Sequence, residues 1–494
     1  MKYTIGYDLG SSSVKAALME IETGKCLATA VSPAQEMPMQ APVAGWAEQD
    51  PELWWQEVQN ATHILQRQHP FDGALVAGIG IAYQMHGLVC VDKEQRVLRP
   101  SIIWCDSRAV EIGNEAFETL GHNWSLQYLL NSPGNFTASK LRWVQQYEPE
   151  IYARIHKIML PGDFIAMRLT GEAATTISGL SEGIFWDFSG RQASQVLLKH
   201  YNINQSLLSD IVPTFGIQGK VTAAAAALLG LAAGTPVTYR AGDQPNNAFS
   251  LNVLKPGEAA TTAGTSGVVY AVHDHIAFDN ESRVNTFVHV NDTEKAPRNG
   301  VLMCLNGTGI LNSWLRQMTG NLAYDEMNSL AGKAPAGARG LKIYPFGNGA
   351  ERILANKDTG AVFNNLNFNI HSREHLLRAG QEGIVFALKY GMDIMTDMGL
   401  QIHRVRAGRA NMFLSPLFRE VFANTANVVI ELYNTDGAQG AARAAGIGAG
   451  CYKEEEAFKG MECLATIEPD AKLQTQYAEI YQQWLEGLKH IINS

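Results

Sequence analysis

Two aspartates lie at the ends of predicted strands, in surroundings that could serve phosphoryl transfer. Asp8 is followed by Gly10 and by three serines at residues 11–13. A carboxylate at the end of a strand can hold Mg²⁺, directly or through water. Gly10 lets the backbone turn so that the next amides and hydroxyls face an anion. The motif indicates a metal and phosphate site, and an ordinary polar hairpin turn is the alternative.

Asp243 provides the second carboxylate, in the sequence RAGDQ at residues 240–244. Transfer of a phosphoryl group to an alcohol requires a group that takes the hydroxyl proton, and a carboxylate can do so. An aspartate at this position could instead cap the helix that follows it. Taken alone the segment favours the cap, whereas the other loops favour the base.

Two further loops carry polar or small residues directly after predicted strands. Residues 261–267 (TTAGTSG) would allow close approach to phosphate, although a plain turn explains them equally well alone. Residues 84–87 (QMHG) offer polar groups to sugar hydroxyls, and Met85 offers an adaptable apolar wall. A single histidine such as His86 is more often structural. Two phosphate-type loops in two halves of one chain are harder to explain as simple turns.

The elements that must position these residues alternate between strand and helix. Strands are predicted at residues 3–9, 14–21, 26–31, 77–82, 237–241, 258–262 and 268–272. Helices are predicted at residues 51–67, 139–148, 162–169 and 473–492, the last as an amphipathic packing helix. This alternation predicts an α/β fold, and its restart after about residue 236 places a domain boundary near residue 245.

Composition excludes several other classes. A chain of 494 residues with 46% hydrophobic and 18% charged residues is long enough for two globular cores. The net charge of −9 argues against a nucleic-acid partner. Glycines and a proline break the apolar stretch at 221–237, and no leader precedes the first strand, so we expect no membrane span and a cytoplasmic location. The six scattered cysteines predict neither a zinc site nor a disulfide framework.

Two common nucleotide-binding motifs are missing from the sequence. It has no Gly-x-x-x-x-Gly-Lys-Ser/Thr, and no Gly-x-Gly-x-x-Gly follows a strand. The glycine-rich run at residues 446–450 lies late on a small-residue helix, where it predicts close packing.

Taken in order, the motifs resemble the FGGY carbohydrate kinases, and within them the xylulokinase branch. In the first half the resemblance is carried by residues 5–10, 46–51, 84–87, 97–104, 136–144, 160–164 and 168–172. In the second half it is carried by residues 242–243, 264–267 and 382–383. Chance does not account for so many matches in the same order.

This resemblance implies two actin-like (ribonuclease H-like) α/β domains with an interdomain cleft. Residues 1–245 would bind the sugar and residues 246–494 would bind ATP with Mg²⁺. Asp243 would be the catalytic base, Asp8 would assist at the metal and phosphate, and both would lie near Mg²⁺. The other implied sugar-binding residues are Trp46, Gln84, Met85, His86 and Gln244. The other implied ATP- and phosphate-binding residues are Gly10, Ser11, Ser12, Lys15, Gly264, Thr265, Ser266, Gly408 and Asn411. The family commonly forms dimers, so a homodimer is a candidate assembly.

Two departures from the family pattern keep three hypotheses open. The family usually has Gly-Asp-Asn at the base, whereas Gln244 follows Asp243 here. A Gly-Gly-Gly-Ala turn is expected near the adenosine, but residues 406–411 are RAGRAN. The first hypothesis is a kinase that converts D-xylulose to D-xylulose 5-phosphate. The second is a kinase for another ketose or a polyol, and the third is a catalytically weak sugar-binding sensor.

Overall fold

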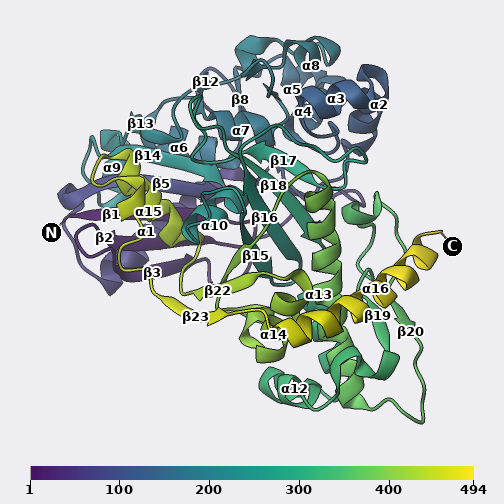
Figure 1. Cartoon of the computed structure of the whole chain (residues 1–494). Helices are drawn as coiled ribbons and strands as arrows, with labels where there is room; N and C mark the ends of the chain where they lie inside the picture. The colour runs from purple at the N-terminus through teal and green to yellow at the C-terminus, as the bar shows by residue number, and fades with distance from the viewer. Residues whose placement is uncertain (1, 494) are drawn as a thin grey trace. The chain divides into compact units, whose positions relative to one another are not determined.

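The computed structural model describes residues 2–493, and the chain divides into two compact units (Figure 1). The first unit runs to Asn252 and adds the segments Phe287–Asn299 and Thr435–Met461. The second unit contains Val253–Thr286, Gly300–Asn434 and the chain from Glu462 onward. Each unit is built around a sheet of its own.

The first unit contains a six-stranded sheet in the order β13-β14-β5-β1-β2-β3. Its strands are β1 (Tyr3–Leu9), β2 (Val14–Glu20), β3 (Cys26–Ser32), β5 (Val76–Tyr83), β13 (Phe215–Lys220) and β14 (Pro236–Gly242). β5 pairs in parallel with β1 on one side and with β14 on the other. The carboxyl ends of these three strands therefore meet at one edge, which is where α/β sheets usually bind ligands.

Different helices cover the two faces of this sheet. Ile5 and Tyr7 point into the core that α1 (Pro51–Gln68) and α6 (Pro161–Thr170) complete. The alternate residues Gly6 and Asp8 point to the other face, because side chains alternate along a strand. α15 (Gly437–Gly448) packs on that other face, in front of β1 and β5 in Figure 1.

Glycines bring α15 unusually close to the sheet. A Cβ added to Gly6 would lie 2.0 Å from the Ala438 carbonyl oxygen, and one added to Gly80 would lie 2.0 Å from that of Ala441. Gly448 is equally confined, because its Cβ would lie 1.9 Å from the Thr238 carbonyl oxygen. The expected close packing of the late glycine-rich run is confirmed as far as α15 extends.

The second sheet has seven strands in the order β17-β18-β16-β15-β21-β22-β23. They are β15 (Glu258–Ala263), β16 (Gly267–His273), β17 (Asn285–Val288), β18 (Asn299–Leu305), β21 (Arg404–Gly408), β22 (Val429–Tyr433) and β23 (Cys463–Ile467). The helices of the second unit are α11 (Gly309–Met318), α12 (Tyr324–Ala331), α13 (Arg373–Asp397), α14 (Pro416–Ala426) and α16 (Ala471–Asn493). α13 is buried along most of its length and forms the centre of this core.

Shorter elements complete the chain. The remaining helices are α2 (Val110–Leu120), α3 (His122–Tyr128), α4 (Thr137–Tyr147), α5 (Pro149–Tyr152), α7 (Ile177–Glu182), α8 (Gln195–His200), α9 (Ala223–Leu229) and α10 (Asp243–Ser250). The remaining strands are β4 (Glu48–Gln49), β6 (Val89–Val91), β7 (Ser101–Ile102), β8 (Lys157–Met159), β9 (Ala174–Thr175), β10 (Trp186–Asp187), β11 (Gln192–Ala193), β12 (Asp210–Ile211), β19 (Lys342–Tyr344) and β20 (Val362–Asn364). Between residues 2 and 493, no helix has the length and apolar character needed to cross a membrane.

Candidate active site

The two predicted carboxylates come together at the carboxyl edge of the first sheet. Asp8 on β1 and Ala241 on β14 both pair with Ala82 on the strand between them. Asp243 follows two residues later as the first residue of α10. The two carboxylates interact electrostatically, because the charge of Asp8 raises the pKa of Asp243.

Asp243 has the electrostatic character of a base that works near neutral pH. Desolvation is the main cause that raises its pKa, to about 7, and the charge of Asp8 adds to it. A hydrogen bond of 3.3 Å from the Gln244 amide opposes this rise. A catalytic group works best when its pKa lies near the working pH, so Asp243 is suited to accept a proton.

Asp8 has a smaller shift. Desolvation raises its pKa to about 6, Lys15 directly opposite it on β2 lowers the pKa, and Asp436 raises it. At neutral pH Asp8 is therefore mainly ionised, which suits an oxygen ligand of a divalent cation.

The first turn of α15 lies against Asp8, a feature that we did not predict. A Cβ added to Gly437 would lie 2.4 Å from Asp8 Oδ2, so the carboxylate packs directly on the bare Cα of this glycine. Asp436 caps the helix by accepting a hydrogen bond of 2.9 Å from the Gln439 amide. Asn246 of α10 donates a hydrogen bond of 2.9 Å to the Gly437 carbonyl and ties the two helices together.

The turn after β1 is held by its own backbone and by neighbouring side chains. The Gly10 amide donates to the Ser13 carbonyl at 3.0 Å. The Ser11 carbonyl accepts from Gln49 Nε2 at 2.6 Å, and the Ser12 carbonyl accepts from the Met37 amide at 2.8 Å. These hydrogen bonds stabilise the turn, and its role in phosphate binding stays a prediction.

The loop after β5 lies beside the base. The main-chain N–H of Gln84 donates to the Leu9 carbonyl at 2.7 Å, which ties this loop to the end of β1. Met85 packs on Gly242, where an added Cβ would lie 2.6 Å from Met85 Cγ and 2.3 Å from Glu182 Oε2. The predicted residue Met85 therefore borders the residue immediately before Asp243.

His86 is held firmly in an unusual backbone conformation. Its φ is 62°, in the left-handed region that non-glycine residues seldom occupy. Its Nδ1 lies 2.9 Å from the Glu182 carbonyl oxygen, and since a carbonyl can only accept, Nδ1 carries the proton. Its ring packs on Phe136 and Phe287 at centroid distances of 4.8 and 5.4 Å.

Glu182 is a buried carboxyl group next to His86 and Gly242 that we did not predict. Only 1% of its surface is exposed. Desolvation raises the pKa of Glu182 well above its usual range, and the charges of Asp243 and Asp163 raise it further.

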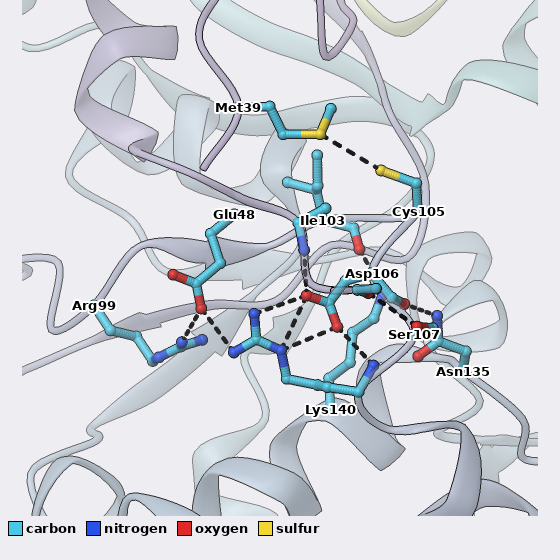
Figure 2. Close-up of polar contacts among 12 residues, drawn as sticks. Met39, Glu48, Arg99, Ile103, Cys105, Asp106, Ser107, Asn135 and Lys140 are labelled. Atoms are coloured by element: carbon cyan, nitrogen blue, oxygen red, sulfur yellow. Dashed lines mark hydrogen bonds and ion pairs between the residues drawn. The ribbon is translucent and has the colours of Figure 1, made fainter. Parts of the chain in front are cut away.

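Trp46 belongs to a separate cation–π cluster. The Arg108 guanidinium lies 3.8 Å from the centre of the Trp46 ring and 4.7 Å from that of Trp143. Arg108 also forms ion pairs of 2.7 Å with Glu48 and with Asp106. Both carboxylates are labelled in Figure 2. A contact between Trp46 and a sugar stays a prediction.

In the second unit, the predicted phosphate turn joins β15 to β16 and meets the start of α11. The Gly309 amide donates to the Gly264 carbonyl at 2.8 Å, and the Ile310 amide donates to the Thr265 carbonyl at 3.1 Å. The Thr308 hydroxyl lies 3.1 Å from both of these carbonyl oxygens. A Cβ on Gly309 would lie 2.3 Å from the Gly264 carbonyl oxygen, so only glycine fits there.

This turn borders a cavity of about 440 Å³, a volume typical of small-molecule sites. Three predicted residues line it, namely Gly264, Thr265 and Asn411. The lining residues that we did not predict are Ile310, Asn312, Ser313, Tyr324, Asp325, Asn328, Met412, Leu414 and Ser415, besides Ala263 and Gly309 beside the turn. Ser266 and Gly408 lie outside this lining, and their roles stay predictions.

The structure explains why an arginine, Arg406, stands near the expected adenosine loop. This arginine lies within β21 and pairs with Glu258 at 3.1 Å and with Glu431 at 2.8 Å. Asn411 has a φ of 52°, and its Nδ2 would lie 3.4 Å from a Cβ on Gly264. The arginine therefore joins three adjacent strands, while Asn411 faces the cavity.

Comparisons with known proteins agree with this arrangement. The chain matches the model of the FGGY family of carbohydrate kinases, N-terminal domain, over residues 3–250 and the C-terminal domain over residues 259–449. It is 32% identical over 453 residues to the xylulose kinase of Escherichia coli (strain K12), which covers 90% of each chain. It is 30% identical over 507 aligned residues to the L-xylulose/3-keto-L-gulonate kinase of the same organism, covering 98% of this chain and 96% of that relative.

Among solved structures, that of xylulose kinase from Rhodospirillum rubrum superposes with a TM-score of 0.89 at 25% sequence identity. The match covers 100% of both chains. The similarity in sequence and in fold therefore extends through both halves of the chain.

Proposed function

Since the chain belongs to the FGGY family of carbohydrate kinases and is an ATP-dependent sugar kinase, we propose that it phosphorylates D-xylulose to D-xylulose 5-phosphate. The choice of sugar is supported by relatives named xylulose kinase, of which one is 32% identical to this chain. The observation that carries the chemistry is Asp243, which follows β14 beside Asp8 and has a pKa of about 7.

In the proposed reaction Asp243 takes the proton of the terminal hydroxyl of the sugar. The hydroxyl oxygen then forms a bond to the γ-phosphorus of ATP, and the bond between that phosphorus and the oxygen of the departing ADP breaks in line. The proton stays on Asp243 until solvent removes it. Gln244 keeps the base oriented through its hydrogen bond to Asp243 Oδ2.

Mg²⁺ bound to ATP would neutralise the charge that develops on the phosphates. Mg²⁺ commonly takes one or two protein carboxylates and completes its octahedral shell with water and phosphate oxygens. Asp8 and Asp243 supply two carboxylates, and the described part of the chain has no group of three or more His, Cys, Asp or Glu side chains able to hold a metal alone. The donor set therefore suits a metal that arrives with the nucleotide.

We assign the other predicted residues by the same scheme. Residues 1–245 would bind the sugar through Trp46, Gln84, Met85, His86 and Gln244. Residues 246–494 would bind ATP, with Gly264, Thr265 and Ser266 at the phosphates and with Gly408 and Asn411 toward the adenosine. Gly10, Ser11, Ser12 and Lys15 would face the transferred phosphate. The cavity beside Gly264 supports the position of the nucleotide.

A coupled ADP-release assay with ATP and Mg²⁺ tests the substrate. D-xylulose is compared by kcat/KM with D-ribulose, sedoheptulose, L-xylulose and glycerol. We expect D-xylulose to be turned over best. A higher kcat/KM for another acceptor would show that the proposed sugar is wrong, and no turnover with any acceptor would favour the sugar-binding sensor.

A second candidate is a kinase for another ketose or a polyol. It is favoured by Gln244, whose longer side chain bonds to the base where the family usually has asparagine. It is also favoured by the similarity to the L-xylulose/3-keto-L-gulonate kinase. The Gln244→Asn variant tests it: a change in the order of acceptors would show that this residue helps to select the sugar.

A further inference from the structure

A lysine without any role in the proposed chemistry is completely buried beside the sugar-binding loop. Lys140 of α4 has 0% of its surface exposed. Its Nζ donates one hydrogen bond of 2.8 Å to the His86 carbonyl and another of 3.0 Å to the Ile103 carbonyl. A buried ammonium is costly unless it is hydrogen-bonded, so these two bonds determine where it lies.

The two carbonyls belong to different loops. His86 lies in the loop after β5, and Ile103 begins the turn that also contains Cys105 and Asp106. Figure 2 shows Lys140 beside this turn. The ammonium is therefore a fixed point between the predicted sugar loop and a second loop of the same unit.

The residue that Lys140 holds has a strained backbone conformation. The left-handed conformation of His86, with a φ of 62°, persists only where the surroundings enforce it. The ring is fixed by Phe136, Phe287 and the Glu182 carbonyl, and the backbone carbonyl is fixed by Lys140. Hydrogen bonds from charged donors are stronger than those from neutral donors. The protonated Lys140 ammonium therefore holds the His86 carbonyl more strongly than the neutral amine would.

We propose that Lys140 is a positioning residue for sugar binding: its ammonium holds the His86 carbonyl, and this keeps Met85 and His86 in the geometry that binds the sugar. The inference rests on the proposed function of this loop. It predicts that the sugar binds more tightly to the protein whose Lys140 is protonated.

The surroundings bring this protonation into the physiological range. Desolvation lowers the pKa of Lys140 to about 7. Asp106 and Cys105 from the neighbouring turn raise the pKa, and Arg108 lowers it, although the Asp106 carboxylate is already paired with Arg108. Sugar affinity should therefore decrease as the pH rises through about 7.

The test is calorimetry of D-xylulose binding about one pH unit below and above this pKa. It is made in the Asp243→Asn background, which removes the titration of the base. The dissociation constant should rise about 3- to 10-fold between the two pH values. Lys140→Met should bind weakly at both, whereas Lys140→Arg, which stays charged, should lose the pH dependence.

Lys157 provides a matched control in the same unit. Its Nζ also donates to two main-chain carbonyls, those of Ser206 at 3.0 Å and Leu208 at 2.8 Å, in contact with neither His86 nor Ile103. Lys157→Met should leave both the sugar affinity and its pH dependence unchanged.

Each outcome decides one question. Wild-type affinity and pH dependence in Lys140→Met would overturn the inference. If that variant does not fold, a pH dependence that persists in Lys140→Arg would overturn it instead. Failure of the Asp243→Asn protein to bind D-xylulose contradicts the proposed sugar, and the same comparison with the best acceptor of the kinase assay then decides on Lys140.

Discussion

The contact between Gly437 and Asp8 leads to a quantitative prediction for Gly437→Ala. The added Cβ would lie 2.4 Å from Asp8 Oδ2 and 2.7 Å from Asp8 Cγ. Ordinary van der Waals contact begins at 3.4 Å, so the carboxylate must move by about 1 Å, because the helix cannot retreat. α15 is confined by Gly6 and Gly80, whose Cα atoms already touch its backbone.

Displacement of a reacting or metal-binding group by about 1 Å costs about 100-fold in rate, which is about 2.7 kcal/mol. Overpacking destabilises by about 1–3 kcal/mol, but alanine gains about 1 kcal/mol over glycine in a helix. We therefore expect Gly437→Ala to lower kcat about 100-fold while its stability changes by only about 0–2 kcal/mol.

The assay is kcat at saturating ATP and sugar, combined with thermal unfolding. Gly446→Ala is the matched control on the same helix, because its Cβ would lie 2.1 Å from Tyr452 Oη and away from Asp8. It should lose stability and keep kcat within about threefold of wild type. If folded Gly437→Ala also keeps kcat within about threefold, Asp8 does not need its observed position, and the proposed role of Asp8 is wrong.

Further predictions concern three single side chains. Asp243→Asn should lower kcat by at least about 100-fold with sugar affinity largely retained, and full activity would exclude Asp243 as the base. Folding raises the pKa of Asp243 from 3.8 to about 7, so the stability that this carboxyl contributes below pH 4 is lost as the pH rises to 7. The difference in melting temperature, variant minus wild type, should therefore be larger at pH 8 than at pH 4. Arg406→Met leaves Glu258 and Glu431 without their shared partner and should destabilise by about 3 kcal/mol in chemical denaturation, whereas an unchanged midpoint would mean that the ion pairs contribute nothing. Asn328→Ala removes an amide from the cavity wall and should raise the KM for ATP about 2- to 10-fold while leaving that for the sugar unchanged; the reverse pattern would contradict a nucleotide in this cavity.

The regular elements near the site could be predicted because their patterns are local. The strands predicted at residues 3–9 and 77–82 appear as β1 and β5, with boundaries that agree within one residue. The strand at 237–241 appears as β14, and the amphipathic helix at 473–492 appears as α16. Alternating hydrophobicity and glycine-containing turns were sufficient signals for these elements.

The meeting of Asp8 with Asp243 could be anticipated only in part. Each lies at the carboxyl end of a strand, but no short motif in the sequence indicates that β1 and β14 flank the same strand β5. The involvement of α15 could not be foreseen at all, since Gly437 lies more than 400 residues after Asp8 in the chain. Contacts between distant segments depend on tertiary packing, which a single sequence does not encode in any short motif.

Lys140 and Glu182 illustrate a second limit. Lys140 lies in a segment that resembled the family, yet a lysine on a helix is normally solvated, and nothing local indicates that this one is buried. Glu182 likewise ends a short helix of small residues and becomes unusual only through its contact with Gly242. Both residues are unusual because an ionisable side chain is buried, and burial depends on the whole fold rather than on the local sequence.

The two groups that titrate near pH 7 around the predicted sugar loop should act in opposite directions. Asp243 must lose its proton to act as a base, so kcat should rise with pH through about 7. Lys140 must keep its proton to hold His86, so sugar affinity should decrease over the same range. Because kcat rises and sugar affinity falls over the same pH range, kcat/KM should have a narrow maximum near neutral pH. Lys140→Arg keeps the charge at every relevant pH, so its kcat/KM should continue to rise above neutrality until it levels off. If the variant instead shows the same decrease as wild type, another group causes it, and the opposition of these two titrations is not what limits the enzyme at high pH.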